Sequence, residues 1–392
     1  MSEWKEYRLG DIAEPQKNTY IPNKEDDYSY IGLEHIEQGT LRLIGTGSSK
    51  EISSQKFIFQ KGDVLFGKLR VYFRKVVQPN FSGICSTDIW VFRAKKNVSQ
   101  TFLFYFLANW DFINTADGGE GGTRMPRADW NFLKTTKWII PPLPEQRAIA
   151  SILSSLDDKI DLLHRQNATL EKMAETLFRQ WFVEEAKEEW EENELGNFIS
   201  IKHGFAFKGE NISPDPTNQI LVTPGNFKIG GGFKSDKFKY YTKEDFPKEY
   251  VFNTGDLIVT MTDLSVDGDT LGYSALVPAN FENEIFLHNQ RVGKVEYKKS
   301  ISKFFLYYLM KTGDYQWYIL SGASGTSIRH TSPTSICSYC FKLPTIDKLS
   351  KFENICSILH EKIGNNQSQI RTLTRLRDTL LPKLMSGEIR IK

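Results

Sequence analysis

The sequence predicts a mixed α/β protein made of two similar halves, each a globular domain followed by one long helix. The first observation is a repeat: PPLPEQRAIASILSSLDDKIDLL, residues 141–163, aligns with residues 344–366 at a constant offset of 203 residues, which places Pro141 on Pro344 and Ile160 on Ile363. The second is a set of short apolar runs bounded by turn residues, as in strands. The third is a heptad pattern that follows the prolines of both repeats.

Composition limits the class of protein. The chain has 392 residues, of which 40% are hydrophobic and 25% charged, as in soluble proteins of two or three domains. The longest apolar runs are short, and Met1 is followed by SEWKEYR instead of an apolar signal segment, so we expect a cytoplasmic protein without membrane spans. With a net charge of only +2, a DNA-binding surface would have to come from local clusters of basic residues.

Motifs for catalysis or metal binding are missing from the sequence. No phosphate-binding loop with its lysine and no dinucleotide fingerprint occurs, and the six histidines are scattered without metal-site spacing. The four cysteines lack the paired spacing of a zinc site, so we expect reduced, mostly buried thiols. The carboxylates of Asp157 and Asp158 are interpreted as solvated charge on a helix surface. We therefore predict a non-enzyme with no metal and no cofactor of its own.

Strand and helix signals place the domain boundaries. Residues 56–59, 89–92 and 256–260 have the apolar pattern of strands, and residues 101–110 and 303–312 that of helices. We predict a first globular domain at 1–143, a first long helix at 144–187, a second globular domain at 188–343 and a second long helix at 344–392. Pro144 is expected in the first helical turn, where its missing N–H costs nothing.

Both long helices carry an apolar seam with steps of four and three residues. In the first helix the seam consists of Ile149, Leu153, Leu156, Ile160, Leu163, Asn167, Leu170, Ala174, Leu177 and Trp181. In the second it consists of Phe352, Cys356, Leu359, Ile363, Asn366, Ile370, Leu373, Arg377, Leu380 and Leu384. Each seam has one asparagine, which fixes register at a cost in stability. We predict an antiparallel coiled coil with pseudo-two-fold symmetry; the alternative is that each helix packs only on its own domain.

Two kinds of segment are candidates for DNA binding. The first mixes basic and aromatic residues, which suits phosphate contact and stacking. Its candidate residues are Lys68, Arg70, Arg74 and Lys75 in the first half and Lys234 and Lys237 in the second. The alternative is an ordinary edge strand protected by lysines.

The second kind is a glycine-containing loop that recurs in equivalent places, at 121–127 and 324–330. It offers hydroxyls, histidine and arginine, which pairs bidentately with guanine. Its candidate residues are Thr123, Arg124 and Arg127 in the first half and Thr326, Ser327, Arg329 and His330 in the second. The alternative is a polar turn ahead of a helix.

With these motifs in place, the chain resembles the specificity subunits of type I restriction-modification systems. Residues 141–182 resemble the central conserved region of that family, residues 376–389 (LRDTLLPKLMSGEI) its C-terminal conserved end, and residues 4–11 and 61–70 the start of a target recognition domain. The resemblance covers essentially the whole chain. Because the two globular halves differ strongly, we expect two different half-sites and an asymmetric target.

The resemblance implies a DNA-reading subunit that binds a split double-stranded site and docks two methyltransferase subunits, through which restriction subunits join. S-adenosylmethionine, ATP and Mg²⁺ would then belong to those partners. Partner or spacer roles are expected for Glu145, Gln146, Arg147, Leu153, Leu156, Ile160, Trp181, Phe182, Leu359, Ile363, Leu373 and Leu380. The rival hypotheses are a non-catalytic scaffold that spaces two partner proteins, and an autonomous DNA methyltransferase or nuclease.

Overall fold

The computed structural model describes residues 4–23, 25–118, 126–235, 238–263, 268–325 and 328–391. Contacts group the chain into two compact units: unit 1 contains residues 1–162 and 370–392, and unit 2 contains residues 163–369. Each unit therefore includes a globular part and a portion of both long helices, α5 (Leu143–Arg179) and α9 (Ile346–Ser386).

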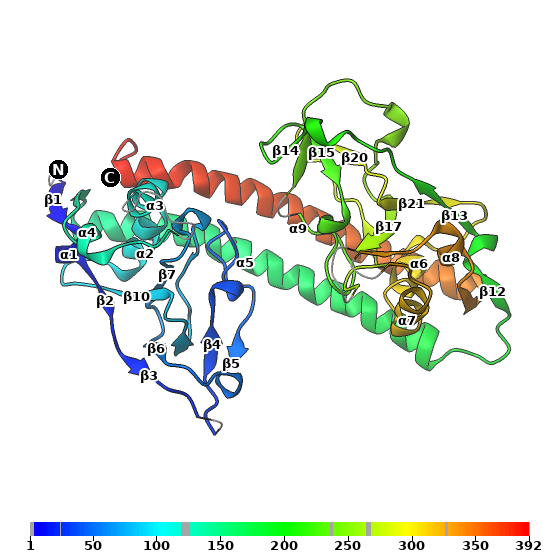
Figure 1. The fold of residues 1–392 in the computed structure, drawn as a ribbon, viewed down its shortest axis with the longest axis horizontal. Helices are drawn as coiled ribbons and strands as arrows, with labels where there is room; N and C mark the ends of the chain where they lie inside the picture. Colours follow the sequence, from blue (N-terminus) through cyan, green and yellow to red (C-terminus); the bar gives the residue numbers. More distant parts are fainter. Residues whose placement is uncertain are drawn as a thin grey trace. The chain divides into compact units, whose positions relative to one another are not determined.

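Unit 1 combines antiparallel sheets with short helices (Figure 1, blue to cyan). Its strands are β1 (Lys5–Arg8), β2 (Ala13–Gln16), β3 (Thr19–Tyr20), β4 (Ser29–Ile31), β5 (Gly47–Ser48), β6 (Lys56–Phe59), β7 (Val64–Gly67), β8 (Val76–Val77), β9 (Gly83–Cys85), β10 (Ile89–Ala94) and β11 (Lys137–Ile140). Its short helices are α1 (Leu9–Ile12), α2 (Gln100–Ala108), α3 (Trp110–Asp117) and α4 (Trp130–Leu133). The sheets have the strand orders β1-β11, β2-β10-β7-β8 and β3-β6-β9-β4-β5, and β4 and β9 pair in parallel.

Unit 2 has the same kinds of element. Its strands are β12 (Glu192–Glu194), β13 (Ile199–His203), β14 (Ile212–Ser213), β15 (Gln219–Val222), β16 (Lys239–Tyr241), β17 (Leu257–Thr260), β18 (Thr262–Asp263), β19 (Ser274–Leu276), β20 (Ile285–His288), β21 (Val292–Tyr297), β22 (Arg329–His330) and β23 (Cys340–Lys342). Its short helices are α6 (Lys303–Leu309), α7 (Gly313–Ser321) and α8 (Pro333–Cys337), and a π-helix, Gln180–Glu184, follows α5. The sheets have the orders β12-β23, β13-β21-β17-β19, β14-β16-β15-β20 and β18-β22.

The repeat found in the sequence is also a structural repeat. At the offset of 203 residues, Ser99 and Ser302 cap α2 and α6, each accepting from a backbone N–H of the first turn. At the same offset β11 corresponds to β23 and α4 to α8. The predicted strands at 56–59, 89–92 and 256–260 and the predicted helices at 101–110 and 303–312 are confirmed as β6, β10, β17, α2 and α6. The mixed α/β class is confirmed.

The core of each unit forms around its most apolar helix. In α2, every residue from Phe102 to Ala108 is buried, as expected of a helix that is apolar on all sides. The same core includes Ile149 and Leu153 of α5 and Leu381 and Leu384 of α9. In unit 2, α6 packs in the same way against Ala174 and Phe178 of α5 and Phe352 and Cys356 of α9. The ends of the predicted seams thus bury side chains in the globular cores as well.

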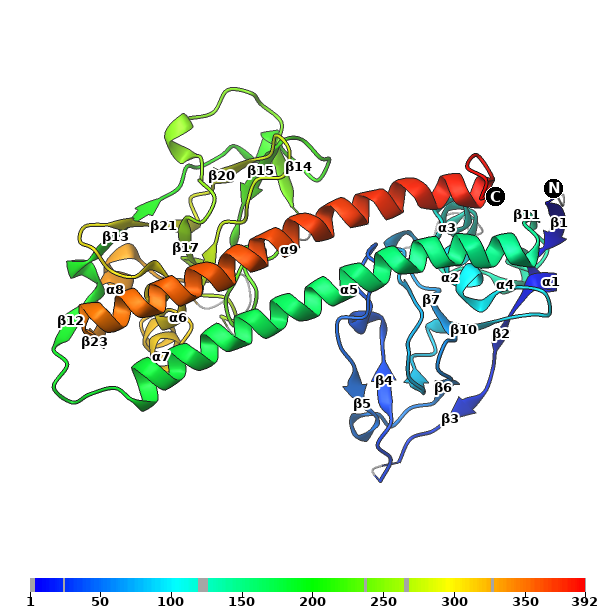
Figure 2. The same ribbon diagram turned by 180° about the vertical axis from the view of Figure 1, so that it is seen from behind.

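The two long helices run antiparallel within each unit (Figure 2). In unit 1, Arg390 contacts Glu145 and Arg377 contacts Asp157, so residue numbers rise on α5 as they fall on α9. In unit 2, the Asn366 amide donates to the Asn167 side-chain oxygen at 2.8 Å. All twenty seam residues named from the sequence are buried or half-buried. Pro144, the second residue of α5, lies in the first turn as predicted.

A buried charge cluster joins the globular part of unit 1 to both helices. Arg377 is 1% exposed, and its guanidinium donates to the Asp157 carboxylate at 2.8 Å and to the carbonyl of Thr40 at 2.9 Å. The hydroxyl of Tyr105 donates to the same Asp157 carboxylate at 2.7 Å. Burial raises the pKa of Asp157, and the Arg377 guanidinium acts to lower it. The interpretation of Asp157 as solvated surface charge was therefore wrong, because Asp157 is the acceptor that a buried arginine requires.

Unit 2 has different groups at the corresponding positions. Tyr308 and His360, the counterparts of Tyr105 and Asp157 at the offset of 203, are hydrogen-bonded at 2.9 Å. Glu175, the counterpart of Asp378, accepts from the Lys311 ammonium at 2.8 Å. Burial lowers the pKa of His360 to about 4, and the ammonium groups of Lys311 and Lys303 act in the same direction. The contact between helix and globular part is thus kept while its chemistry changes.

The prediction of free, mostly buried thiols is only partly confirmed. All four cysteines are free thiols, but only Cys85 and Cys356 are buried, whereas Cys337 is half-buried and Cys340 exposed. Over the ranges that the structure describes, no helix is both long and apolar enough to cross a membrane. No group of three or more metal-ligating side chains occurs among those same residues.

The neutral state of His360 predicts a pH-dependent stability of unit 2. An unfolded histidine has a pKa of about 6.5, so between about pH 6.5 and 4 the unfolded state binds a proton that the folded state does not. The free energy of unfolding should therefore fall as the pH drops through this window, by about 2 kcal/mol between pH 7 and pH 5 from this residue alone. Urea unfolding of the wild type and of His360→Gln at both pH values measures the effect.

The variant should have a smaller pH dependence than the wild type. Buried His288, whose pKa burial also lowers to about 4, remains in both proteins, so part of the pH dependence should persist in His360→Gln. Equal pH dependence in the two proteins would show that His360 is not a buried neutral histidine.

Candidate DNA-recognition site

The structure brings together two candidate segments of unit 1 that are far apart in sequence. The Arg70 N–H donates to the Pro126 carbonyl and the Ala128 N–H to the Lys68 carbonyl, both at 2.9 Å, and Leu69 and Arg127 form an antiparallel bridge. Lys68, Arg70 and Arg127, which we call the basic cluster, therefore lie on adjacent backbone segments. Arg127 is exposed, and its guanidinium lies 3.3 Å from the Asp88 carboxylate.

Local electrostatics hold the basic cluster in place. Partial burial lowers the pKa of Lys68, the Asp88 carboxylate raises it and the Arg127 guanidinium lowers it again. Asp88 thus neutralises part of the charge of two cations that would otherwise repel each other. An incoming phosphate or base edge can compete with Asp88 for the exposed Arg127 guanidinium, which retains donors after one ion pair.

Backbone conformation separates the remaining cations of this segment. Arg70 and Arg74 both have left-handed backbone angles, with φ of 52° and 49°, on either side of a single 3₁₀ turn, Val71–Phe73. The turn leaves Tyr72 44% exposed and buries Arg74 to 3%. The Arg74 guanidinium donates to the Ala108 carbonyl at 2.7 Å and pairs with Asp378 at 3.3 Å.

The prediction that Arg74 contacts DNA is therefore wrong: it is a buried structural arginine whose ring partner is Trp110, at 5.2 Å from the guanidinium carbon to the ring centroid. Lys75 is half-buried, and its ammonium donates to the Leu33 carbonyl. Of the four basic residues in this segment, Lys68 and Arg70 remain candidates.

Unit 2 repeats the backbone pairing with other side chains. Strand β18 pairs with β22 in the register Thr262 to His330 and Asp263 to Arg329. The imidazole Nδ1 of exposed His330 lies 3.1 Å from the Thr262 hydroxyl, and the buried carboxylate of Asp263 accepts from the Thr270 hydroxyl at 2.8 Å. We call Thr262, Asp263, Arg329 and His330 the polar cluster. It occupies the place of the basic cluster but carries acceptors and a titratable ring next to its one arginine.

The other candidates are distributed as follows. Lys234 is exposed on a loop that follows three left-handed glycines, Gly230 to Gly232, and its N–H donates to the Asn226 carbonyl at 2.8 Å. Thr123, Arg124, Lys237, Thr326 and Ser327 lie outside the described residues.

Comparison with known proteins shows which proteins this chain is similar to. Residues 1–172 match the family model described as the type I restriction modification DNA specificity domain. The specificity subunit of type I restriction enzyme MjaIX from Methanocaldococcus jannaschii is 26% identical over 413 residues, which cover 99% of this chain and 89% of the relative. The specificity subunit of the HindI enzyme from Haemophilus influenzae is 23% identical over 460 residues, covering 99% and 100%.

Over nearly its whole length, the chain is similar to specificity subunits of type I restriction-modification systems. A crystal structure of the type I S subunit from M. genitalium has the same fold, with a TM-score of 0.56, 16% identity and coverage of 97% of this chain and 96% of the neighbour. The expected resemblance is confirmed, and the prediction of a non-catalytic specificity subunit agrees with the names of these relatives.

The residues expected to serve as partner contacts or spacer lie in several different environments. Gln146 is 2% exposed and ties α5 to the globular part of unit 1, because its amide donates to the Pro141 carbonyl and accepts from the Ser99 N–H. Glu145 accepts from the Trp4 indole at 2.9 Å, so only Arg147 of this triplet is exposed. Leu153, Ile160 and Ile363 are buried, and Leu156, Leu359, Leu373 and Leu380 are half-buried.

Of the two aromatic residues expected to contact a partner or form the spacer, Phe182 is buried and Trp181 is half-buried. Phe182 packs against Phe305 and Phe352, each at a centroid distance of 5.0 Å, and Trp181 lies half-buried beside the same core. Both residues lie in the π-helix at Gln180–Glu184 that follows α5.

Sequence reasoning missed the polar contacts between helices and globular parts. The residues that make these contacts all lie inside the repeat: Tyr105, Asp157, Tyr308 and His360. Comparing the aligned pairs was the available signal, because a tyrosine is hydrogen-bonded to a polar residue of a long helix in both halves. Nothing in the periodicity alone separates Asp157 from its exposed neighbour Asp158.

The structural role of Arg74 predicts a clear difference between two arginines of unit 1. Arg74→Met should lower the free energy of unfolding by about 2–4 kcal/mol, because it leaves the Ala108 carbonyl unpaired and removes a cation beside Asp378. Arg127→Met, at an exposed position, should change it by about 0.5 kcal/mol or less. Urea unfolding followed by hydrogen exchange on peptides of unit 1 measures both; equal effects would contradict the assignment.

Proposed function

We propose that this chain is the DNA sequence-recognition subunit of a type I restriction-modification complex in the cytoplasm. It binds a bipartite, asymmetric double-stranded site, one half-site per unit. It docks two methyltransferase subunits and through them restriction subunits, and so directs adenine methylation or restriction. S-adenosylmethionine, ATP and Mg²⁺ bind to those partners, and this chain selects the DNA site.

The observation that supports this proposal best is the pair of clusters on equivalent backbone segments. In both units a short segment that follows a core strand pairs with the segment ahead of α4 or α8, and this pairing presents polar side chains. Arginine recognises guanine bidentately, lysine contacts phosphate, and hydroxyls and imidazole bond to either kind of group. Because the basic cluster and the polar cluster differ in charge, the two units read different half-sites.

The spacer role rests on the long helices. The seam residues are buried or half-buried, and the amides of Asn167 and Asn366 bond to each other at 2.8 Å. We propose that α5 and α9 form an antiparallel coiled coil, related by a pseudo-two-fold axis, that sets the separation between the half-sites. Exposed residues of these helices, such as Arg147, are then available to the partner subunits.

Mapping of methylated adenines by single-molecule sequencing tests the proposal. Cells that express this chain with its methyltransferase subunit are compared with cells that lack only this chain. The expected result is a split, asymmetric methylation motif that disappears without the chain. An unchanged methylation pattern would reject the recognition function and favour a protein scaffold.

Substitutions in the two clusters should affect different half-sites. Arg127→Gln removes a donor pair and should relax base preference in one half-site, weakening specific binding by about 1–3 kcal/mol. His330→Ala should do the same in the other half-site only. Lys96→Gln, an exposed position of unit 1 outside the clusters, is the matched control and should leave both half-sites unchanged.

Binding to DNA libraries in which each half-site is randomised separately measures these effects. A loss of affinity that is uniform over all sequences would mean that Arg127 and His330 contact phosphates and do not read bases.

A further inference from the structure

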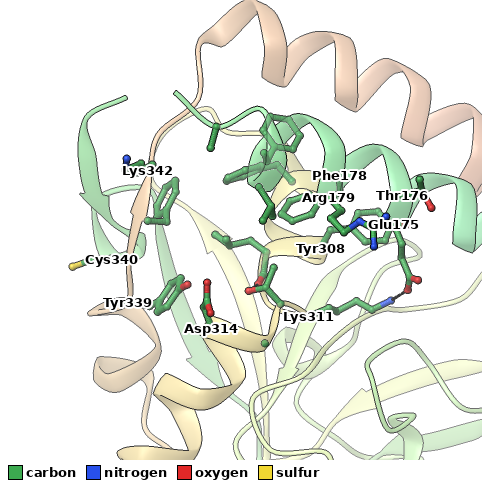
Figure 3. A pocket seen from close by; sticks show the side chains of 18 of the residues that line it. Glu175, Thr176, Phe178, Arg179, Tyr308, Lys311, Asp314, Tyr339, Cys340 and Lys342 are labelled. Atoms are coloured by element: carbon green, nitrogen blue, oxygen red, sulfur yellow. Dashed lines mark hydrogen bonds and ion pairs between the residues drawn. The ribbon is translucent and has the colours of Figure 1, made fainter. Parts of the chain in front are cut away.

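A large pocket opens in unit 2 beside the C-terminal part of α5 (Figure 3). Its volume is about 810 Å³, which is in the range of ligand and anchor-residue pockets. Aromatic side chains, among them Phe178, Phe182, Tyr308 and Phe341, form its inner wall. Charged side chains at its edge include Arg179 and Lys342, which are exposed.

Two substitutions between the repeats account for this open space. At the offset of 203 residues, Trp110 and Trp138 of unit 1 correspond to Gly313 and Phe341 of unit 2, and both of the latter line the pocket. In unit 1, the Trp138 ring packs against Phe106 at a centroid distance of 5.1 Å, and the Trp110 ring lies on the Arg74 guanidinium. Unit 2 therefore lacks one indole entirely and has a smaller ring in place of another.

The surroundings of the missing indole are kept. In unit 1 the Arg74 guanidinium, which lies against the Trp110 ring, pairs with Asp378 of α9. In unit 2 the Lys311 ammonium pairs with Glu175 of α5, the counterpart of Asp378. The Lys311 ammonium also lies 4.9 Å from the Tyr307 ring centroid and 5.3 Å from that of Tyr308. A Cβ added at Gly313 would have no atom within 4 Å, so the first atom of a side chain meets open space there. The site can therefore accept an aromatic ring next to a cation, as unit 1 already does.

An apolar contact is also exposed at the edge of the pocket. The π-helix after α5 places Val183 at the pocket with 54% of its surface exposed, next in sequence to Phe182 of the aromatic wall. An exposed aliphatic side chain in this position can serve as one of the surrounding contacts that exclude water from an inserted anchor residue.

We propose that this pocket is a docking site for an aromatic side chain carried by a protein partner. The inserted ring takes the place that Trp110 fills in unit 1, stacks on the aromatic wall and lies near the Lys311 ammonium. In the proposed function, on which this inference rests, the partner is the methyltransferase subunit. The docking is asymmetric, because the corresponding place in unit 1 is already occupied by the chain's own tryptophan.

The test fills the pocket from within the full-length chain. Gly313→Trp restores the residue of unit 1 at its own place, the first residue of the helix after the Thr312 cap, as Trp110 follows Asn109. Val183→Glu puts a charge at the pocket edge without filling it. Gly209→Trp is the control: it adds the same side chain at an exposed glycine of unit 2 whose Cβ also has no atom within 4 Å. Unchanged thermal unfolding is required of all three.

Native mass spectrometry with the methyltransferase subunit gives the stoichiometry and the dissociation constant. The wild type and Gly209→Trp should bind two methyltransferase copies, whereas Gly313→Trp and Val183→Glu should keep one copy and bind the second at least tenfold more weakly. Wild-type affinity for both copies in Gly313→Trp would overturn the pocket proposal and leave the proposed function intact. Absence of any complex with the wild type would overturn both.

Discussion

The burial of Arg377 is the constraint on which the arrangement of unit 1 depends. A guanidinium that is 1% exposed cannot lose its proton, so the fold has to provide acceptors around it. Those acceptors come from three separate parts of the chain: Asp157 on α5, Asp378 on α9 and the Thr40 carbonyl in the globular part. Sliding α9 along α5 by one residue would separate Arg377 from Asp157 and the Thr40 carbonyl and leave it only Asp378 of its own helix. The cluster therefore determines both the register of the two helices and the position of the globular part on them.

In unit 2 the same positions are in contact, but fewer of the groups that meet there are charged. A tyrosine and a histidine replace the tyrosine and aspartate, and a lysine pairs with the acidic residue of the long helix where unit 1 uses arginines. Sequence duplication has thus kept the positions at which helices and globular parts touch while the residues changed as pairs. The same rule applies to the candidate recognition clusters, where one backbone pairing carries lysine and arginine in unit 1 and threonine, aspartate, arginine and histidine in unit 2.

Periodicity and repeats predicted the elements well because they reflect backbone geometry. The seams, the strands around Phe59 and Val91 and the proline at the start of α5 all follow from local pattern. The errors concern where single side chains point. Arg74, Gln146 and Asp157 are polar residues in segments that look exposed. Contacts with partners more than thirty residues away bury Arg74 and Gln146 and half-bury Asp157. The open pocket beside Gly313 was also missed, although the replacement of Trp110 by Gly313 at the repeat offset was an available signal.

The direct test of the central claim, that paired helices fix the separation of two half-sites, is insertion of one heptad into both helices. The insertions go near Asn167 and Asn366, so that the seam stays in phase on both sides. Seven residues add about 10 Å at ~1.5 Å per residue, against ~3.4 Å per base pair. The gap between methylated half-sites should lengthen by about 3 base pairs while the half-site sequences stay the same. An unchanged gap, with the protein folded and the methylation motif intact, would contradict the account.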